Sequence, residues 1–252
     1  MRPRARLCRW RVATLAAAVL LPLPALAQSL NLDLGEGGTV TGQLVSLVLL
    51  ITVLSLAPSI LVMVTSFTRF VVVFAFLRSA LGLQQTPPNA VIISLALFLT
   101  AFVMAPTFER AWETGISPLI AEEIEIDQAF ERTAAPFRIF MLAQVREKDL
   151  ELLLELADAG PVEAPEDTPL RALVPAFMIS ELRRAFEIGF LVFVPFLVID
   201  MVVASILMSM GMMMLPPVLI SLPFKLIFFV LVDGWFLIVG SLVESFARAP
   251  PV

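Results

Sequence analysis

Charged side chains inside apolar runs are the first sign of chemistry in this chain of 252 residues. Asp200, Lys225 and Asp233 each lie in a stretch that is otherwise almost entirely apolar. A charged group at the centre of a membrane-spanning helix costs at least about 2.5–3.5 kcal/mol unless it is paired or hydrated. The three residues therefore indicate an ion pair, a proton relay or a pair of catalytic carboxylates.

An ion pair between Asp200 and Lys225 is the interpretation that the spacing favours. If the flanking helices form an antiparallel hairpin that turns near Met212–Met213, the two side chains lie at nearly equal distances from the turn and meet. Pairing opposite charges removes most of the cost of burial. A proton relay is the alternative. Asp200 and Asp233 would suit an intramembrane aspartyl protease, but 232-VDGW-235 lacks the glycine-x-glycine-aspartate context of such proteases.

A second unusual feature is 208-MSMGMMMLPP-217, which places five methionines in seven residues directly before a proline pair. Methionine is unbranched, flexible and polarizable, so it fills irregular gaps and can re-pack around objects of changing shape. The run is therefore either filler at the end of a helix or a soft apolar surface for a changing partner.

The composition indicates an integral membrane protein. The chain is 59% hydrophobic and 15% charged, against about 45–50% and about 25% in soluble proteins. It has no histidine, and its one cysteine is Cys8, so imidazole chemistry, thiol nucleophiles and His or Cys metal sites are excluded. We expect neither an enzyme nor a cofactor. The acidic balance also argues against nucleic acid as a partner.

The N-terminus predicts a cleaved signal peptide over residues 1–27. Five arginines precede the apolar run 12-VATLAAAVLLPLPALA-27, which ends in a small-x-small triplet typical of a cleavage site. The alternative is an uncleaved first span, although the apolar run is short for that role. Cleavage would remove Cys8 and leave a mature chain that cannot form disulfides.

The rest of the chain predicts an all-α fold of two kinked helical hairpins separated by a helical insert. A short segment, residues 28–43, precedes the first hairpin (44–108); the acidic insert (109–187) and the second hairpin (188–252) follow. Four stretches are long enough to cross a bilayer: Leu44–Val64, Ala90–Phe108, Ile188–Met208 and Val218–Val243. Each contains or adjoins a proline that removes a backbone donor and bends a helix: Pro58, Pro106, Pro195 and Pro223.

The charges between the spans predict the orientation. A cleaved signal leaves residue 28 on the exported side, so the loop that carries Arg69 and Arg78 would face the cytoplasm, as the positive-inside rule prefers. The insert would then be periplasmic, and the methionine run would lie toward the cytoplasm.

Within the insert, 137-FRIFMLAQVREKDLELLLELADAG-160 predicts one amphipathic helix that stops at a Gly-Pro pair. A second helix is expected over residues 171–190. Helices in so small an insert have little room for a core of their own, so we expect them to dock against neighbouring copies or subunits. A small independent domain is the alternative.

Five long runs resemble one known family in order and in spacing. They are 65-TSFTRFVVVFAFLRSALG-82, 86-TPPNAVIISLALFLTAFVMAP-106, 175-PAFMISELRRAFEIGF-190, 195-PFLVIDMVVASILMSMGMMMLPP-217 and 222-LPFKLIFFVLVDGWFLIVGSL-242. They closely resemble the FliP family, the export-gate proteins of flagellar type III secretion, whose injectisome counterpart is SctR.

The resemblance implies a ring of about five copies that joins FliQ and FliR in a cone-shaped pore. Its place would be the bacterial inner membrane, in the flagellar basal body, beside other membrane proteins of the export apparatus. Unfolded flagellar proteins would pass through it. A separate ATPase and the proton-motive force would supply the energy, so this chain would be a conduit.

The resemblance also assigns roles to particular residues. A gasket that seals the pore around unfolded substrates would be formed by Met210, Met212, Met213 and Met214. The loop would bend at Gly211 and end at Pro216 and Pro217, where the next helix starts.

Phe140 and Glu181 fall where relatives place pore-facing residues, and Leu153 stands where some relatives have an aromatic residue. Ordinary helix packing is the alternative for Phe140, and a solvated or Arg184-paired carboxylate is the alternative for Glu181. Two other functions stay open, a secondary transporter and, less favoured, an intramembrane aspartyl protease. A transporter would act without partner subunits.

Overall fold

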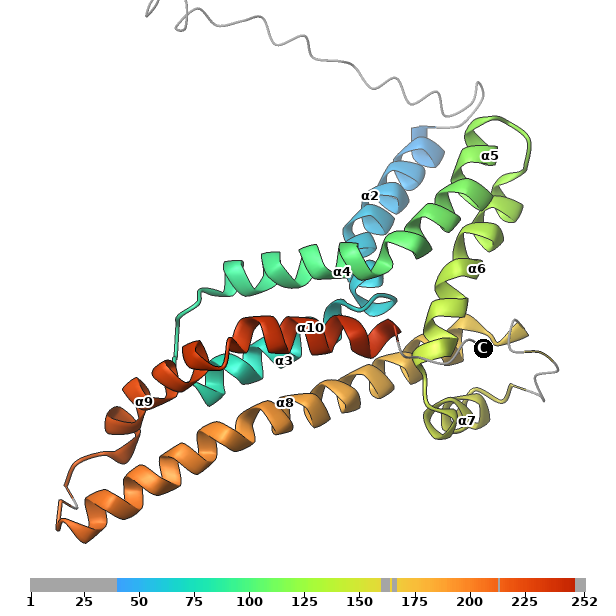
Figure 1. Ribbon diagram of the computed structural model, residues 1–252. Coiled ribbons are helices and arrows are strands. Elements are labelled where there is room, and N and C mark those ends of the chain that lie inside the picture. The colour runs from blue at the N-terminus through green and yellow to red at the C-terminus, as the bar shows by residue number, and fades with distance from the viewer. Residues whose placement is uncertain (1–39, 160–163, 165–166, 213, 248–252) are drawn as a thin grey trace, which may run out of the picture. The chain divides into compact units, whose positions relative to one another are not determined.

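The computed structural model describes residues 40–159, 164, 167–212 and 214–247, and every regular element within these ranges is a helix (Figure 1). The signal peptide expected over residues 1–27, residues 28–39 of the following segment, and Met213 lie outside the described residues. The chain divides into two units between Thr52 and Val53, within α2 (Val40–Met63). All of the packing described below belongs to the second unit.

Helix α3 (Phe67–Ala80) lies along α8 (Leu170–Ser209) and forms the centre of the second unit (Figure 1). Its buried residues recur at spacings of three and four, as one face of a helix requires. They pack against α4 (Asn89–Ala111), α8 and α10 (Gly234–Ala247) in the main core cluster: Phe70, Val73, Phe74, Ile92, Ala96, Leu99, Ala185, Leu242 and Phe246.

The prediction that Arg69 and Arg78 lie in a loop is therefore wrong, because both residues lie on α3. The reason is the apolar period of 67-FTRFVVVFAFLRSA-80, which places Arg69 on the same buried face as Val73. Arg69 is fully buried, whereas Arg78 donates to Asn89 Oδ1 at 2.5 Å, where α4 begins. The buried guanidinium cannot act as a free cytoplasmic charge, so the charge argument for orientation keeps only Arg78.

Helix α8 runs for 40 residues without a break, from the insert into the second hairpin. Pro175 and Pro195 both lie inside it, as Pro58, Pro106 and Pro223 lie inside α2, α4 and α9 (Pro217–Leu231). After the turn of this hairpin, the chain bends by 62° between α9 and α10. It occurs at Asp233, which has a φ of 51°, rather than at Pro223.

The prediction of a single amphipathic helix over residues 137–160 is wrong, because the chain forms two helices there, α6 (Ile126–Gln144) and α7 (Glu147–Leu156). Val145 and Arg146 adopt extended backbone conformations between them. The break is stabilised by α8, since the Arg146 amide donates to Ser180 Oγ on that helix at 3.1 Å.

Helix α4 continues through one π-helical turn (Trp112–Ile116) into the short α5 (Ser117–Ile120). Gly115 lies in this turn against α6, and a Cβ atom there would come within 2.1 Å of Thr133 Oγ1. A glycine is therefore needed where the two helices approach each other.

Two described helical stretches are long and apolar enough to cross a membrane, Asn89–Ile120 and Leu170–Ser209, and the bent pair α9–α10 would make a third. These stretches contain three of the four expected spans. The first expected span, Leu44–Val64, nearly coincides with α2, of which Leu47–Ile60 forms a shorter apolar helix.

Candidate functional site

The methionine run forms a loop, residues 210–216, that joins α8 to α9; we call it the methionine loop. Gly211 has a φ of 73° and ends α8 in a Schellman motif. The Gly211 amide donates to Met208 O at 3.1 Å, and the Met212 amide donates to Leu207 O at 3.0 Å. Because only glycine adopts this backbone conformation without strain, the direction of the chain at the start of the loop is fixed.

Two of the described methionine side chains of the loop are open to their surroundings. Met210 is 64% exposed and Met214 is 98% exposed, whereas Met212 is half-buried. Pro216 precedes α9 and Pro217 is its first residue, where a fixed φ suits the start of a helix. The loop thus presents flexible apolar side chains between two well-defined helix ends.

Asp200 and Lys225 lie together, with Lys225 Nζ 2.6 Å from Asp200 Oδ2. The ammonium group is buried, with 4% of the lysine side chain exposed, while the aspartate side chain is 32% exposed. Ser221 Oγ donates to the other carboxylate oxygen, Oδ1, at 2.5 Å. Sequence reasoning missed Ser221 as a partner of Asp200. The spacing could have indicated it, because Ser221 and Lys225 are four residues apart on α9 and share one face of the helix.

Arg69 and Glu181 form a second ion pair that sequence reasoning missed altogether. Both side chains are fully buried. Arg69 Nε donates to Glu181 Oε2 at 2.8 Å, and Arg69 Nη2 donates to Oε1. Burial lowers the pKa of the Arg69 guanidinium, and the hydrogen bond and charge of Glu181 oppose that effect. A bidentate pair of this kind is the geometry in which arginine binds a carboxylate most strongly.

The same guanidinium also contacts α6 and α10. Arg69 Nη2 donates to Gln144 Oε1 at 3.0 Å, and Nη1 donates to Ser245 Oγ at 2.7 Å. The centroid of the Phe246 ring lies 3.6 Å from the guanidinium carbon, in a cation–π contact. We call Arg69, Glu181, Gln144, Ser245 and Phe246 the Arg69 node. It joins α3, α6, α8 and α10 at one point.

The two residues expected to face a pore both lie within the packing of a single chain. Glu181 is buried against Arg69, so it is neither solvated nor paired with Arg184. Phe140 is half-buried, with its ring centroid 5.9 Å from Phe177 and 6.1 Å from Phe246. We therefore propose no pore-facing role for Glu181, whereas the pore-facing role of Phe140 stays a prediction.

The two aspartates that a protease would need are not brought together. Asp200 is held by Lys225 and Ser221, whereas Asp233 is exposed at the bend that follows α9. Lys225 and Asp233 are eight residues apart, which corresponds to about 12 Å along a helix. A catalytic dyad requires two carboxylates that share a proton, so this arrangement does not support the protease.

Large apolar side chains cover the outside of these helices. Among the exposed ones are Phe98, Phe102, Phe190, Leu191, Met201, Phe224, Val230, Leu231 and Phe236. Soluble monomers rarely expose so many large apolar side chains. The fold and the helix lengths thus define an all-helical protein of the membrane-embedded class.

The chain belongs to the FliP family, whose model matches residues 50–242. The flagellar biosynthetic protein FliP of Caulobacter vibrioides is 62% identical over 233 residues, which are 92% of this chain and 88% of that protein. The FliP of Rhizobium meliloti is 59% identical over 83% of this chain and 86% of its own. The FliP of Bacillus subtilis is 55% identical over 80% and 91%.

Proposed function

We propose that the chain is a membrane-embedded subunit of the flagellar protein-export apparatus. Membership of the FliP family and the helices of membrane-spanning length support this role. The relatives are named flagellar biosynthetic proteins, which fits a component of flagellar assembly. Other proteins of the export apparatus are its partners.

The finer proposal is that about five copies join FliQ and FliR around a pore in the inner membrane, with residues 109–187 on the periplasmic side. The apolar exterior supports an assembly, because Phe224, Val230 and Phe236 are each more than half exposed on the chain alone. Lipid or neighbouring subunits must cover such surfaces. Unfolded flagellar proteins cross the membrane through this pore.

The methionine loop seals the pore, and its exposure between two fixed helix ends is the observation that carries this proposal. A seal must stop ions, yet it must also stretch around a polypeptide with any sequence of side chains. An apolar constriction excludes ions by dewetting. Methionine adapts its shape without fixed directional demands, so a ring of such loops from several copies meets both requirements.

The chain carries out no reaction in this proposal. The charged residues buried among its helices are engaged in structural pairs, Asp200 with Lys225 and Arg69 with Glu181. A conduit needs stable walls and an adaptable constriction, and these pairs join the helices that form the walls.

Replacing Met212, Met213 and Met214 with alanine is expected to raise the ion permeability of vesicles that contain the assembled complex severalfold. Alanine is too short to close the ring, so water and ions enter the constriction. Ion flux into proteoliposomes measures the effect. Unchanged flux in a complex of normal composition would contradict the sealing role.

The matched control is Met63→Ala/Met201→Ala. Both methionines are exposed, at 43% and 61%, and both lie on helices outside the loop. This variant removes the same kind of side chain from the surface and is expected to leave the ion flux unchanged. If it raises the flux equally, methionine in general, rather than the loop, maintains the barrier.

The native mass of the extracted complex tests the assembly. Co-expression with FliQ and FliR is expected to yield one species with about five copies of this chain. A monodisperse monomer or dimer that supports export would overturn the ring and favour a secondary transporter, which acts without partner subunits.

A further inference from the structure

The end of α3 is completed by a side chain from another helix. A helix leaves its last four carbonyl groups without a partner in the helix itself. In α3, backbone amides that follow the helix bind three of them: Leu81 N donates to Leu77 O, Gly82 N to Ser79 O and Leu83 N to Arg78 O. The fourth, Ala80 O, accepts a hydrogen bond from Lys225 Nζ at 3.1 Å.

Lys225 therefore joins three helices through one ammonium group. It caps α3 at Ala80 and, on its other side, binds the carboxylate of Asp200 on α8, while it belongs to α9 itself. A cation at the C-terminal end of a helix is also favoured by the helix dipole. We call these contacts of Lys225 with Ala80 O and Asp200 the lysine tie.

The packing differs on the two sides of the lysine tie. One helical turn toward the core, Phe196 on α8 and Phe229 on α9 are buried against Leu77 and Leu81. The other side consists of the end of α8 from Met201 to Ser209 and the start of α9 from Pro217 to Phe224, which we call the outer arm. Most of its large side chains are exposed.

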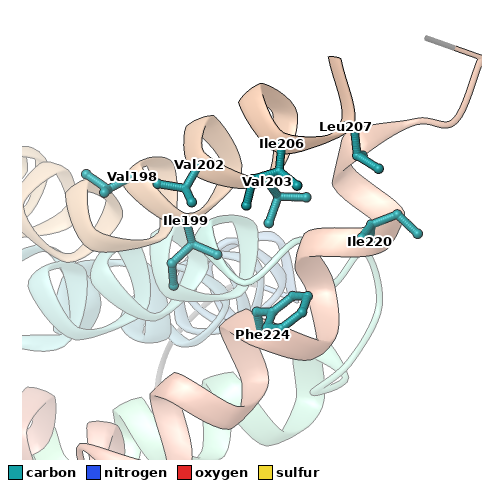
Figure 2. A pocket seen from close by; sticks show the side chains of 8 residues that line it. All are labelled: Val198, Ile199, Val202, Val203, Ile206, Leu207, Ile220 and Phe224. Carbon is teal, nitrogen blue, oxygen red and sulfur yellow. The ribbon is translucent and has the colours of Figure 1, made fainter. Parts of the chain in front are cut away.

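The two helices of the outer arm are loosely packed against each other. An open apolar groove of about 420 Å³ lies between them and extends to Val198 and Ile199 on α8. Figure 2 shows Val202, Val203 and Ile206 on α8 facing Ile220 and Phe224 on α9 across it. Protein interiors contain few voids larger than a water molecule. The arm that carries the methionine loop therefore has room to change its packing. The hollow beside Phe196 and Phe229, on the other side of the tie, is smaller, at about 280 Å³.

We propose that Lys225 is a positioning residue for the methionine loop. By capping α3 it fixes the point from which the outer arm extends, and the arm moves as a unit about that point. This inference rests on the proposed function in one respect, since the loop is taken to be the seal. The tie and its effect on the arm can be measured without any transport.

The experiment compares backbone amide hydrogen exchange in the full chain, reconstituted in lipid nanodiscs, for three variants and the wild type. Lys225→Met removes the whole tie. Asp200→Asn removes the ion pair but keeps the Lys225 ammonium group, which donates to Ala80 O. Lys225→Met/Asp200→Leu replaces both charges with apolar groups, which leaves no unpaired charge and preserves folding.

Exchange of the outer-arm amides is expected to rise about ten- to a hundredfold in the double variant, the factor that loss of one hydrogen bond from a charged group produces. Asp200→Asn leaves the buried Lys225 ammonium its hydrogen bond to Ala80 O, so it is expected to raise the exchange of the outer-arm amides less than Lys225→Met does. Amides of α3 from Phe70 to Leu77 serve as the internal reference and are expected to remain protected in every variant that folds.

Two results would overturn the proposal. If the double variant restores wild-type protection of the outer arm, Lys225 serves only to neutralise Asp200, and the cap on Ala80 positions nothing. If Asp200→Asn loosens the arm as much as Lys225→Met, the ion pair alone holds it. A loosened arm in a complex whose ion permeability never depends on the methionines would instead refute the seal and leave the tie standing.

Discussion

The Arg69→Met variant is expected to unfold about 6–20 °C below the wild type. Removing one partner of a buried ion pair costs about 3–5 kcal/mol, because the remaining charge stays buried without compensation. Here the remaining charge is the Glu181 carboxylate, which is fully buried. The midpoint of thermal unfolding of the chain in detergent measures this change.

The loss extends beyond one pair because the guanidinium also donates to Gln144 and Ser245. Without it, α6 and α10 each lose their polar contact with α3. We therefore expect the insert and the C-terminal helix to loosen together, which limited proteolysis at the α6–α7 break and at the end of α10 would detect.

The matched control for this prediction is Arg183→Met. Arg183 and Glu187 form an arginine–glutamate pair on the same helix α8, with side chains 58% and 60% exposed. Exposed pairs contribute about 0–1 kcal/mol, so this variant is expected to unfold near the wild-type temperature. If both variants lower the midpoint equally, the burial of the Arg69 node does not determine its contribution.

Gly234→Ala is expected to destabilise the chain by about 1–3 kcal/mol through overpacking. Gly234 is the buried first residue of α10, after the 62° bend. A Cβ atom there would lie 2.1 Å from Cε2 and 2.2 Å from Cδ2 of Phe229. The ring cannot retreat freely, because it also packs edge-on against Trp235 with the centroids 5.6 Å apart. Thermal unfolding measures the loss.

Two further variants test the cause. Gly240→Ala places the same methyl group on the same helix where no atom lies within 4 Å, so it is expected to be neutral or to stabilise by about 0.5–1 kcal/mol. Gly234→Ala/Phe229→Leu makes room for the new methyl group and is expected to recover part of the loss. Additive effects of the two substitutions would rule out the steric explanation.

Sequence reasoning predicted the helical class and brought Asp200 and Lys225 together, because both follow from short-range patterns. Apolar runs of sufficient length predict helices, and equal distances from a turn place two residues of a hairpin opposite each other. The bends were predicted less well. The 62° change of direction occurs at Asp233, where the backbone enters the left-handed region, and no proline marks it.

The Arg69 node could not be predicted in the same way, because its other members lie 75 to 177 residues from Arg69 along the chain. No local spacing relates Arg69 to Gln144 or Ser245. One signal was available: apolar residues at 70, 73, 74 and 77 have a helical period, which places Arg69 on the buried face. Treating its charge as a topological marker hid that pattern. The partner of Lys225 at Ala80 is a backbone carbonyl, which carries no sequence signal at all.

The unbroken α8 also restricts where the chain can change in length. Its 40 residues span about 60 Å, roughly twice the hydrocarbon thickness of a bilayer. One inserted residue would shift everything beyond it by about 1.5 Å and rotate it by about 100°. An insertion between Glu181 and Met210 would therefore rotate the methionine loop about the axis of α8 relative to the insert, so the methionines would face another direction. Natural variation in length should fall outside Leu170–Ser209, for example in the segment between α7 and α8.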